Sequence, residues 1–319
     1  MRYFFCSLLL ALALLPAIAP AQELEGWKLV FQDEFNGKGR PNQMKWRYET
    51  GLVRCHEPQW YSKDLANVCQ RNGALELTAL KLDKPRKNPN YDPKAPPQRW
   101  QKARQTYSYT SGSIETAERF SFQYGKVEVR AKLTKGQGAW PAIWTLGTSF
   151  AKHDWPYCGE IDILEYVWSS PQTAWSTLHF IGSDKIPTNR RSKGYTGPEV
   201  ADGQWHTYGF EWDKDQMTFF FDGKAFFTWD VNMANQPDGS NPFRAPHYLK
   251  LNLALGDPQN WGGKLDPSIL PQTYYVDYVR IWQRPLPGME QQTKKGAAKG
   301  KGKGKPRPKA KPRPRKKQA

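Results

Sequence analysis

Gly159-Glu160-Ile161-Asp162-Ile163-Leu164-Glu165-Tyr166 decides the fold, because three carboxylates alternate there with Ile and Leu. Apolar residues between acids are typical of a strand with one face in the core and one polar face. In an unbroken strand, Glu165 would point into the core, where an unpaired carboxylate is costly. One extra residue, a β-bulge at Ile163–Leu164, restores the alternation. We therefore predict a bulged strand that carries Glu160, Asp162 and Glu165 in a row on one exposed face.

A row of crowded carboxylates indicates a specific chemistry. Mutual repulsion raises the pKa of at least one member. A charged acid beside a protonated acid is what retaining glycoside hydrolysis requires: one attacks the anomeric carbon, and the other protonates the leaving oxygen and then deprotonates water. A solvated acidic strand face, without catalysis, is the alternative interpretation of these residues alone.

The octapeptide resembles the catalytic signature of glycoside hydrolase family 16, in the bulged E-x-D-x-x-E form of its laminarinase-like (endo-β-1,3-glucanase) branch. The likeness continues in order over residues 27–284, in Tyr109–Gly112, Tyr124–Lys132, Gly138–Trp144 and Val276–Trp282. It implies an all-β, concanavalin-like jelly-roll sandwich of two antiparallel sheets with a concave substrate cleft. It also implies Glu160 as nucleophile, Glu165 as general acid/base, and Asp162 as the residue that hydrogen-bonds the nucleophile.

The resemblance further implies a set of substrate contacts. Trp140 and Trp144 lie four residues apart on one strand face, and at least one should form a stacking wall; core packing is the alternative. His179 should bond a substrate hydroxyl or tune the acid. The other expected sugar contacts are Asn67, Glu115, Asn252 and Trp261. Many laminarinase-like members carry Arg where this chain has Ser113, a departure that bears on the sugar preference.

No cofactor is expected for catalysis, but the resemblance suggests a structural calcium ion. Gly73 would supply its carbonyl and Asp277 its carboxylate, with Glu34 as a further ligand. Calcium takes oxygen ligands of this kind. The alternative is that Asp277 is merely exposed.

The first residues predict export. Arg2, the apolar run from Leu8 to Leu15 and Ala19-Pro20-Ala21 are typical of a signal peptide over residues 1–21, cleaved before Gln22. The apolar run is too short to span a membrane. We therefore expect a secreted or periplasmic mature chain without a transmembrane segment.

Cysteine pairing stays open at this point. Cys55, Cys69 and Cys158 remain after signal removal, and export permits a disulfide. Proximity in the sequence favours a bond between Cys55 and Cys69, which would leave Cys158 free. Connectivity cannot be read from spacing alone.

The catalytic sandwich should occupy residues 22–286. The whole chain has 26 Gly and 26 Pro residues and is 14% aromatic, which fits a turn-rich all-β domain. Asn72-Gly73 and Asp222-Gly223 predict hairpins, whereas Asp83–Arg104 and Ser183–Pro198 predict irregular polar loops.

Residues 287–319 differ from the rest of the chain in composition, because they are rich in Lys, Arg, Gly and Pro. Such a segment cannot bury a core and should be disordered. A basic tail favours an anionic partner, here an anionic polysaccharide or a cell-surface polyanion. No specific nucleic acid is expected, because the tail has no aromatic residue to stack on bases.

The sequence thus predicts an exported, endo-acting, retaining hydrolase that cleaves β-glucan, with β-1,3 linkages favoured, by double displacement. Two alternatives stay open. One is a hydrolase or transglycosylase acting on mixed-linkage glucan or on an agar or carrageenan-type galactan. The other is a non-catalytic glucan-recognition protein, against which the intact acids argue.

Overall fold

The computed structural model describes residues 25–182 and 189–284. The chain divides into a compact unit that ends at Gln283 and a separate segment from Arg284 onward. The expected signal peptide (1–21) and basic tail (287–319) lie outside the described residues. Within those described ranges, no helix is both long and apolar enough to cross a membrane.

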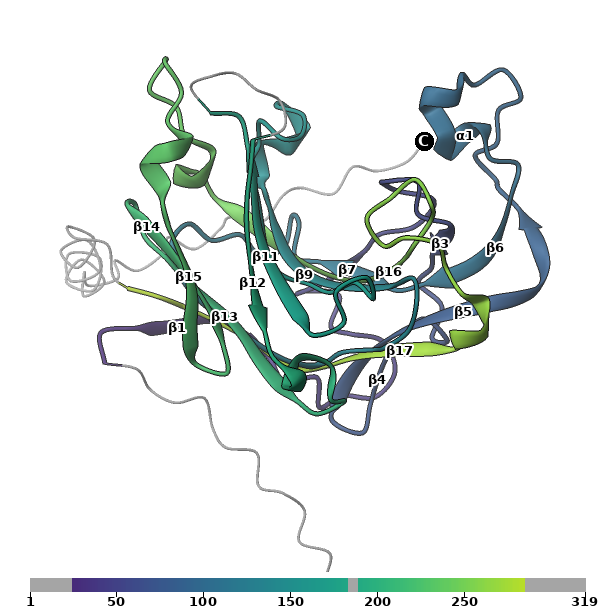
Figure 1. The fold of residues 1–319 in the computed structure, drawn as a ribbon, viewed down its shortest axis with the longest axis horizontal. Helices are drawn as coiled ribbons and strands as arrows, with labels where there is room; N and C mark the ends of the chain where they lie inside the picture. The colour runs from purple at the N-terminus through teal and green to yellow at the C-terminus, as the bar shows by residue number, and fades with distance from the viewer. Residues whose placement is uncertain (1–24, 183–188, 285–319) are drawn as a thin grey trace, which may run out of the picture. The chain divides into compact units, whose positions relative to one another are not determined.

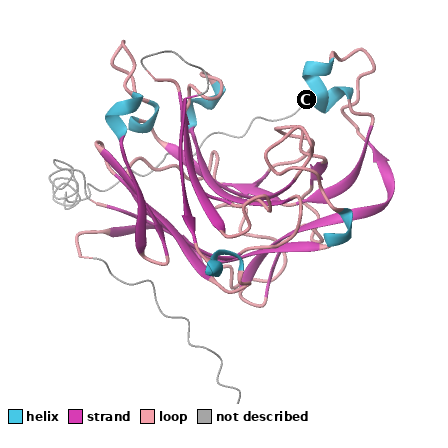
Figure 2. Ribbon diagram, viewed as in Figure 1, coloured by secondary structure: helices cyan, strands magenta, loops and turns pink. Residues whose placement is uncertain are grey.

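Two stacked sheets form the compact unit (Figures 1 and 2). The seven-stranded sheet has the order β12 (Asn189–Thr196), β11 (Thr173–Phe180), β10 (Glu160–Glu165), β9 (Ala139–Gly147), β16 (His247–Leu255), β7 (Ser113–Glu115) and β2 (Arg47–Tyr48). The ten-stranded sheet has the order β15 (Lys224–Asp230), β14 (Gln216–Phe221), β13 (His206–Trp212), β8 (Gly125–Lys132), β17 (Gln272–Gln283), β5 (Ala74–Lys87), β6 (Thr106–Ser111) and β3 (Gln59–Tyr61), with β1 (Lys28–Asp33) paired to β17 and β4 (Val68–Arg71) paired to β5.

Helices are short and lie in the connections. They are α1 (Trp100–Ala103) and the 3₁₀ turns η1 (Pro97–Arg99), η2 (Thr148–Ala151), η3 (Pro198–Ala201), η4 (Val231–Ala234), η5 (Pro242–Arg244) and η6 (Pro267–Ile269). The predicted all-β jelly-roll sandwich is therefore confirmed. One departure from two purely antiparallel sheets is the parallel pairing of β3 with β6.

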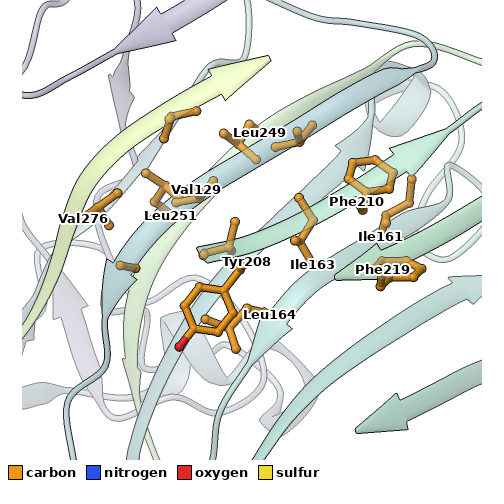
Figure 3. Packing of buried hydrophobic residues seen from close by; sticks show 14 of the residues in the cluster. Val129, Ile161, Ile163, Leu164, Tyr208, Phe210, Phe219, Leu249, Leu251 and Val276 are labelled. Atoms are coloured by element: carbon orange, nitrogen blue, oxygen red, sulfur yellow. The ribbon is translucent and has the colours of Figure 1, made fainter. Parts of the chain in front are cut away.

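The core lies between the sheets and follows the alternation of the strands. In β8, Val127, Val129 and Ala131 are fully buried, while the residues between them are not. Strand β10 contributes Ile161 from the other sheet, beside Phe210 of β13 (Figure 3). Because each sheet has one apolar face, the acids of β10 are left on the opposite face. We call this face of the seven-stranded sheet the catalytic face.

Both predicted hairpin turns are present. Asn72 and Gly73 join β4 to β5 with φ of 55° and 76°, and Asp222 and Gly223 join β14 to β15 with φ of 45° and 73°. Positive φ at both central residues is the type I′ geometry that matches strand twist and that Asn-Gly and Asp-Gly favour.

The two predicted loops are wrong in part. Strand β5 continues to Lys87 and pairs there with β6, and η1 and α1 follow before Arg104. Residues 189–196 form β12, which pairs along its whole length with β11. Residues 83–87 and 190–193 are exposed, and β12 is the edge strand of its sheet, so neither segment needs apolar residues. A neighbouring strand, rather than apolar alternation, makes them extended.

Replacing Leu164 by Ala tests how tightly the bulge is packed. Leu164 is fully buried in the main core, so Leu164→Ala should lower the free energy of unfolding by about 2–5 kcal/mol. Urea denaturation measures this. Leu65, which is 46% exposed, provides the control, because Leu65→Ala should change stability by less than about 0.5 kcal/mol. Equal effects of the two substitutions would contradict the described packing.

Candidate active site

The predicted bulge is present in β10. Asp162 pairs with Trp144 of β9, but the next pair in the ladder is Leu164 with Ile143. On the other side, the register with β11 also shifts between Asp162 and Glu165. Two successive residues, Ile163 and Leu164, therefore enter the core (Figure 3). This restores the parity and returns Glu165 to the catalytic face.

The acids form a cluster rather than an exposed row. The side chain of Glu160 is 16% exposed and that of Asp162 only 4%. His179 Nε2 of β11 lies 3.7 Å from Glu160 Oε1 and 3.3 Å from Asp162 Oδ2. Glu165 has another partner, because Trp140 Nε1 donates to its Oε1 at 3.1 Å. The prediction of an exposed face is thus wrong for Asp162, which His179 and the flanking strands cover.

Burial gives all three acids an unusual titration. It raises the pKa of Asp162 to about 8. Burial, together with the charge of Asp162, raises the pKa of Glu165 to about 8, against opposing effects of His179 and Trp140. The same two causes raise the pKa of Glu160 well above its usual value, while His179 and Arg54 oppose the shift. The cluster therefore keeps protons at neutral pH, where ordinary carboxyl groups have lost them.

A cation could also bind in this cluster. Ligand atoms of Glu160, Asp162 and His179 lie within 4.8 Å of one another. Asp162 Oδ2 is buried without an aligned hydrogen bond. Carboxylate and imidazole suit several divalent metals, but Glu160 and Asp162 are also the acids for which the sequence predicts catalytic roles.

Indole rings gather beside Glu165. The rings of Trp140 and Trp261 meet edge to face at 5.9 Å, and Trp175 meets Trp261 at 6.3 Å. Trp261 is 40% exposed, so it can offer a face to a sugar. The structure thus brings the predicted Trp140 and Trp261 together. Trp175 was not predicted, although its spacing from His179 on one strand places both on the catalytic face.

Trp144 has a structural role instead. Its ring is covered by Arg54 at 5.0 Å and by Lys250 Nζ at 4.9 Å, and only 7% of the residue is exposed. Its Nε1 donates to Asn252 Oδ1 at 2.7 Å. Of the two alternatives for the tryptophan pair, the stacking wall fits Trp140 and packing fits Trp144.

Three predicted sugar contacts are buried and bonded within the protein. Asn252 donates to the Tyr61 hydroxyl at 3.1 Å. Glu115 accepts from Lys250 Nζ at 2.5 Å. Asn67 donates from Nδ2 to the Thr78 carbonyl at 2.8 Å and to Thr110 Oγ1 at 3.0 Å. These contacts bond the side chains of Asn67, Glu115 and Asn252 internally, and none of the three is more than 7% exposed. Their contact with a sugar stays a prediction.

The sequence reasoning missed a charge network next to the acids. Lys250 Nζ, whose side chain is 3% exposed, bonds Glu49 Oε1 at 2.7 Å as well as Glu115. Arg54 bonds both oxygens of Glu49, at 3.0 and 2.7 Å. The sequence pattern could have predicted this network. Lys250 lies in the alternating strand 249–255 on the same face as Asn252, and a buried Lys needs oppositely charged partners.

The expected calcium ligands are already paired. Arg280 donates from Nε and Nη2 to the two oxygens of Glu34, at 2.8 Å each. Arg130 Nη1 donates to Asp277 Oδ2 at 2.5 Å. Guanidinium groups thus neutralise both carboxylates that would have joined the Gly73 carbonyl, so this side-chain set does not fit calcium as arranged.

The proposed disulfide is wrong. Cys55, Cys69 and Cys158 are all free thiols. Cys55 lies in the connection before β3 and is exposed, whereas Cys69 is buried in β4 of the ten-stranded sheet. Closeness in sequence did not bring these two residues together.

Comparisons with known proteins agree with this geometry. The model of glycosyl hydrolases family 16 matches residues 59–280. Glucan endo-1,3-beta-glucosidase A1 of Niallia circulans is 34% identical over 84% of this chain, which spans only 39% of that enzyme's length. The crystal structure of a laminarinase from Flavobacterium sp. UMI-01 has a TM-score of 0.66 at 32% identity, covering 80% of this chain and 100% of the other.

A further solved structure comes from work on the endo-acting O-glycanases with which members of the human gut microbiota initiate mucin breakdown. Its TM-score is 0.77 at 35% identity, with coverage of 86% of this chain and 97% of the other. Both kinds of relative are thus similar to this chain over most of its length.

Replacing Trp140 by Phe should change the pH dependence in a defined direction. The Trp140 N–H favours ionised Glu165 and so lowers its pKa. If Glu165 must be protonated to act as an acid, kcat/KM should fall above about pH 8, and Trp140→Phe should move this alkaline limb to higher pH. Trp261→Phe is the control, because Trp261 contacts Trp140 by its ring alone. A limb that stays in place or moves down would contradict the assignment.

Proposed function

Because this chain belongs to the glycosyl hydrolases of family 16, we propose that it is an exported, endo-acting, retaining hydrolase of β-glucan that acts at β-1,3 linkages. The observation that carries the proposal is the bulge in β10, which places Glu165 on the same face as Glu160 and Asp162 but with different partners. Carboxyl groups whose environments differ can take the separate roles of acid and nucleophile.

The proton distribution suits double displacement. Glu165, with a pKa of about 8, is protonated at neutral pH and can give its proton to the leaving oxygen. Asp162, with a pKa of about 8, can keep a proton and donate a hydrogen bond to Glu160. Burial and the charge of Asp162 both raise the pKa of Glu160, and a proton on Asp162 removes the second of these causes, which favours the ionised form of Glu160. Ionised Glu160 then attacks the anomeric carbon, and Glu165 afterwards takes a proton from water.

The positions of the side chains define two ends of the site. The indoles beside Glu165 offer apolar faces, on which sugar rings stack. His179, near Glu160 and Asp162, can bond a sugar hydroxyl as well as stabilise negative charge. The polypeptide provides these groups without requiring a cofactor for the acid/base and nucleophilic steps described.

A galactose-containing glycan is the second candidate substrate. The similarity to the structure from the mucin O-glycanase work, with a TM-score of 0.77 against 0.66 for the laminarinase, favours considering it. Ser113, which stands where many laminarinase-like members carry Arg, is consistent with a changed sugar preference. Product profiles on laminarin, mixed-linkage glucan, agarose and mucin-type glycans distinguish the two candidates.

Glu160→Gln should abolish turnover and leave folding and oligosaccharide binding largely intact, because the amide keeps the shape but cannot act as the nucleophile. Release of reducing ends from laminarin measures turnover, and calorimetry with the same oligosaccharides measures binding. Glu165→Gln is the matched variant: it should lose polysaccharide cleavage but still form the glycosyl-enzyme with an aryl glycoside whose leaving group needs no proton. An active Glu160→Gln enzyme would refute the catalytic assignment.

The basic tail is proposed to hold the enzyme on an anionic polysaccharide or cell-surface polyanion. Residues 289–319 contain 13 Lys or Arg and one acid, Glu290, which is +12 of the chain's net charge of +17. Contacts of this kind weaken with salt. Deleting 289–319 should abolish retention on an anionic matrix at low salt while leaving kcat/KM on soluble glucan unchanged. Equal retention of the full chain and the deletion variant would remove this role.

A further inference from the structure

Arg54 is the partly exposed end of the buried charge network on the catalytic face. Its Nη1 and Nη2 bond the two oxygens of Glu49, and its Nε lies 3.5 Å from Glu57 Oε1. The guanidinium has five N–H donors, and these contacts account for one on each nitrogen. The side chain is 21% exposed. One N–H on each of the two terminal nitrogens therefore remains for a ligand.

Several contacts fix Arg54 in place. Its guanidinium lies over the rings of Trp144 at 5.0 Å and Tyr61 at 5.3 Å. The segment that carries it is held from outside by the α1 region: Gln101 Nε2 donates to the Val53 carbonyl at 3.1 Å, and the His56 and Trp100 rings stack at 4.9 Å. A donor fixed before the ligand arrives loses little entropy on binding.

Arg54 also lies close to the reacting groups. Its guanidinium lies over the ring of Trp144, and Trp144 pairs with Asp162 in the ladder between β9 and β10. Arg54 is therefore placed next to the strand that carries the acids. Lys250, the other cation of the network, is buried below Trp144 and reaches only carboxylates among its hydrogen-bond partners in the described chain.

The charge balance indicates what Arg54 can recognise. Arg54 and Lys250 face three carboxylates, those of Glu49, Glu57 and Glu115. Burial opposes ionisation of Glu49, but the two cations outweigh it and lower its pKa to about 2. The positive charge of Arg54 is thus already neutralised within the network. An anionic substituent would need an uncompensated cation, whereas a neutral hydroxyl needs only a fixed donor.

We propose that Arg54 is a specificity-determining residue that donates hydrogen bonds to a hydroxyl group of the sugar bound next to Glu160. This inference rests on the proposed function, because it requires a sugar at that place. Ser113 supports it: its Oγ donates to Glu49 Oε2 at 2.6 Å, the same oxygen that Arg54 Nη2 bonds. Ser113 and Arg54 thus share this carboxylate oxygen, and Ser113 helps to hold Glu49 where Arg54 bonds it.

The test uses oligosaccharide substrates that each lack one hydroxyl group. Against wild type, one member of this series should show a kcat/KM about 10- to 100-fold below the parent sugar, the range expected for a hydrogen bond to a charged group. Arg54→Met should lower kcat/KM for the parent sugar by a similar factor and remove the difference between the parent and that one member. The ratio of kcat/KM for the parent sugar to kcat/KM for the deoxy sugar does not depend on the fraction of folded enzyme.

Arg54→Lys keeps a positive charge beside Glu49, so this second variant tests the proposal if Arg54→Met does not fold. It should keep the thermal midpoint closer to that of wild type but lose the discrimination, because an ammonium cannot reproduce the planar fork. Arg71→Met is the control, since Arg71 is exposed and pairs with Glu76 on the other sheet. Unchanged discrimination in both Arg54 variants would overturn the proposal. A loss confined to sulfated or carboxylated glycans would also overturn it.

Failure of the proposed function is distinguishable. If wild type releases no reducing ends from any glycan of the panel, the hydrolase proposal falls, and binding of the same deoxy series to Glu160→Gln and to Glu160→Gln/Arg54→Lys still tests Arg54. A tenfold or greater affinity difference that depends on Arg54 supports its role. Equal affinities across the series refute it.

Discussion

The site depends on one constraint of strand geometry: successive side chains point to opposite faces of a sheet. Glu160 and Glu165 are an odd number of residues apart, so an unbroken strand cannot present both on one face. The structure resolves this by sending both Ile163 and Leu164 into the core, where their burial favours the bulge. Hydrophobic packing on one side of β10 thus fixes the positions of the acids on the other side. A one-residue change of register would exchange the two faces.

The sheet buries the acids and so shields them from water, but it leaves them on a face that a ligand can reach. Burial raises their pKa values, and the neighbours then separate their roles: an indole N–H bonds Glu165, while imidazole lies beside Glu160 and Asp162. Buried charges need partners, and the same rule explains the network around Lys250. Its two cations offset the charge of Glu49 and Glu115, and burial raises the pKa of the third carboxyl group, Glu57, to about 7. The polar side of the site is therefore preorganised and carries little net charge.

Sequence reasoning predicted features that local periodicity controls, such as the bulge and the type I′ turns at Asn72-Gly73 and Asp222-Gly223. It failed where the partner is distant in the chain. Asn252 bonds Tyr61, which lies 191 residues away, and Glu115 bonds Lys250 at a separation of 135 residues. No local pattern specifies such contacts. The sequence therefore could not show which polar residues of the catalytic face bond the protein and which remain for a sugar.

The two ends of the site offer a substrate different kinds of interaction: apolar stacking at one end and hydrogen bonding at the other. Beside Glu165, the rings of Trp140, Trp175 and Trp261 provide broad apolar faces that accept many sugars. Beside Glu160, the polar network replaces such a surface, because cations cover the ring of Trp144. Stacking supplies affinity with little selectivity, whereas a fixed hydrogen-bond donor penalises a sugar that lacks its hydroxyl group. In the proposed function, the indoles would therefore supply most of the affinity, and the guanidinium that the neighbouring carboxylates hold in place would determine the choice of sugar.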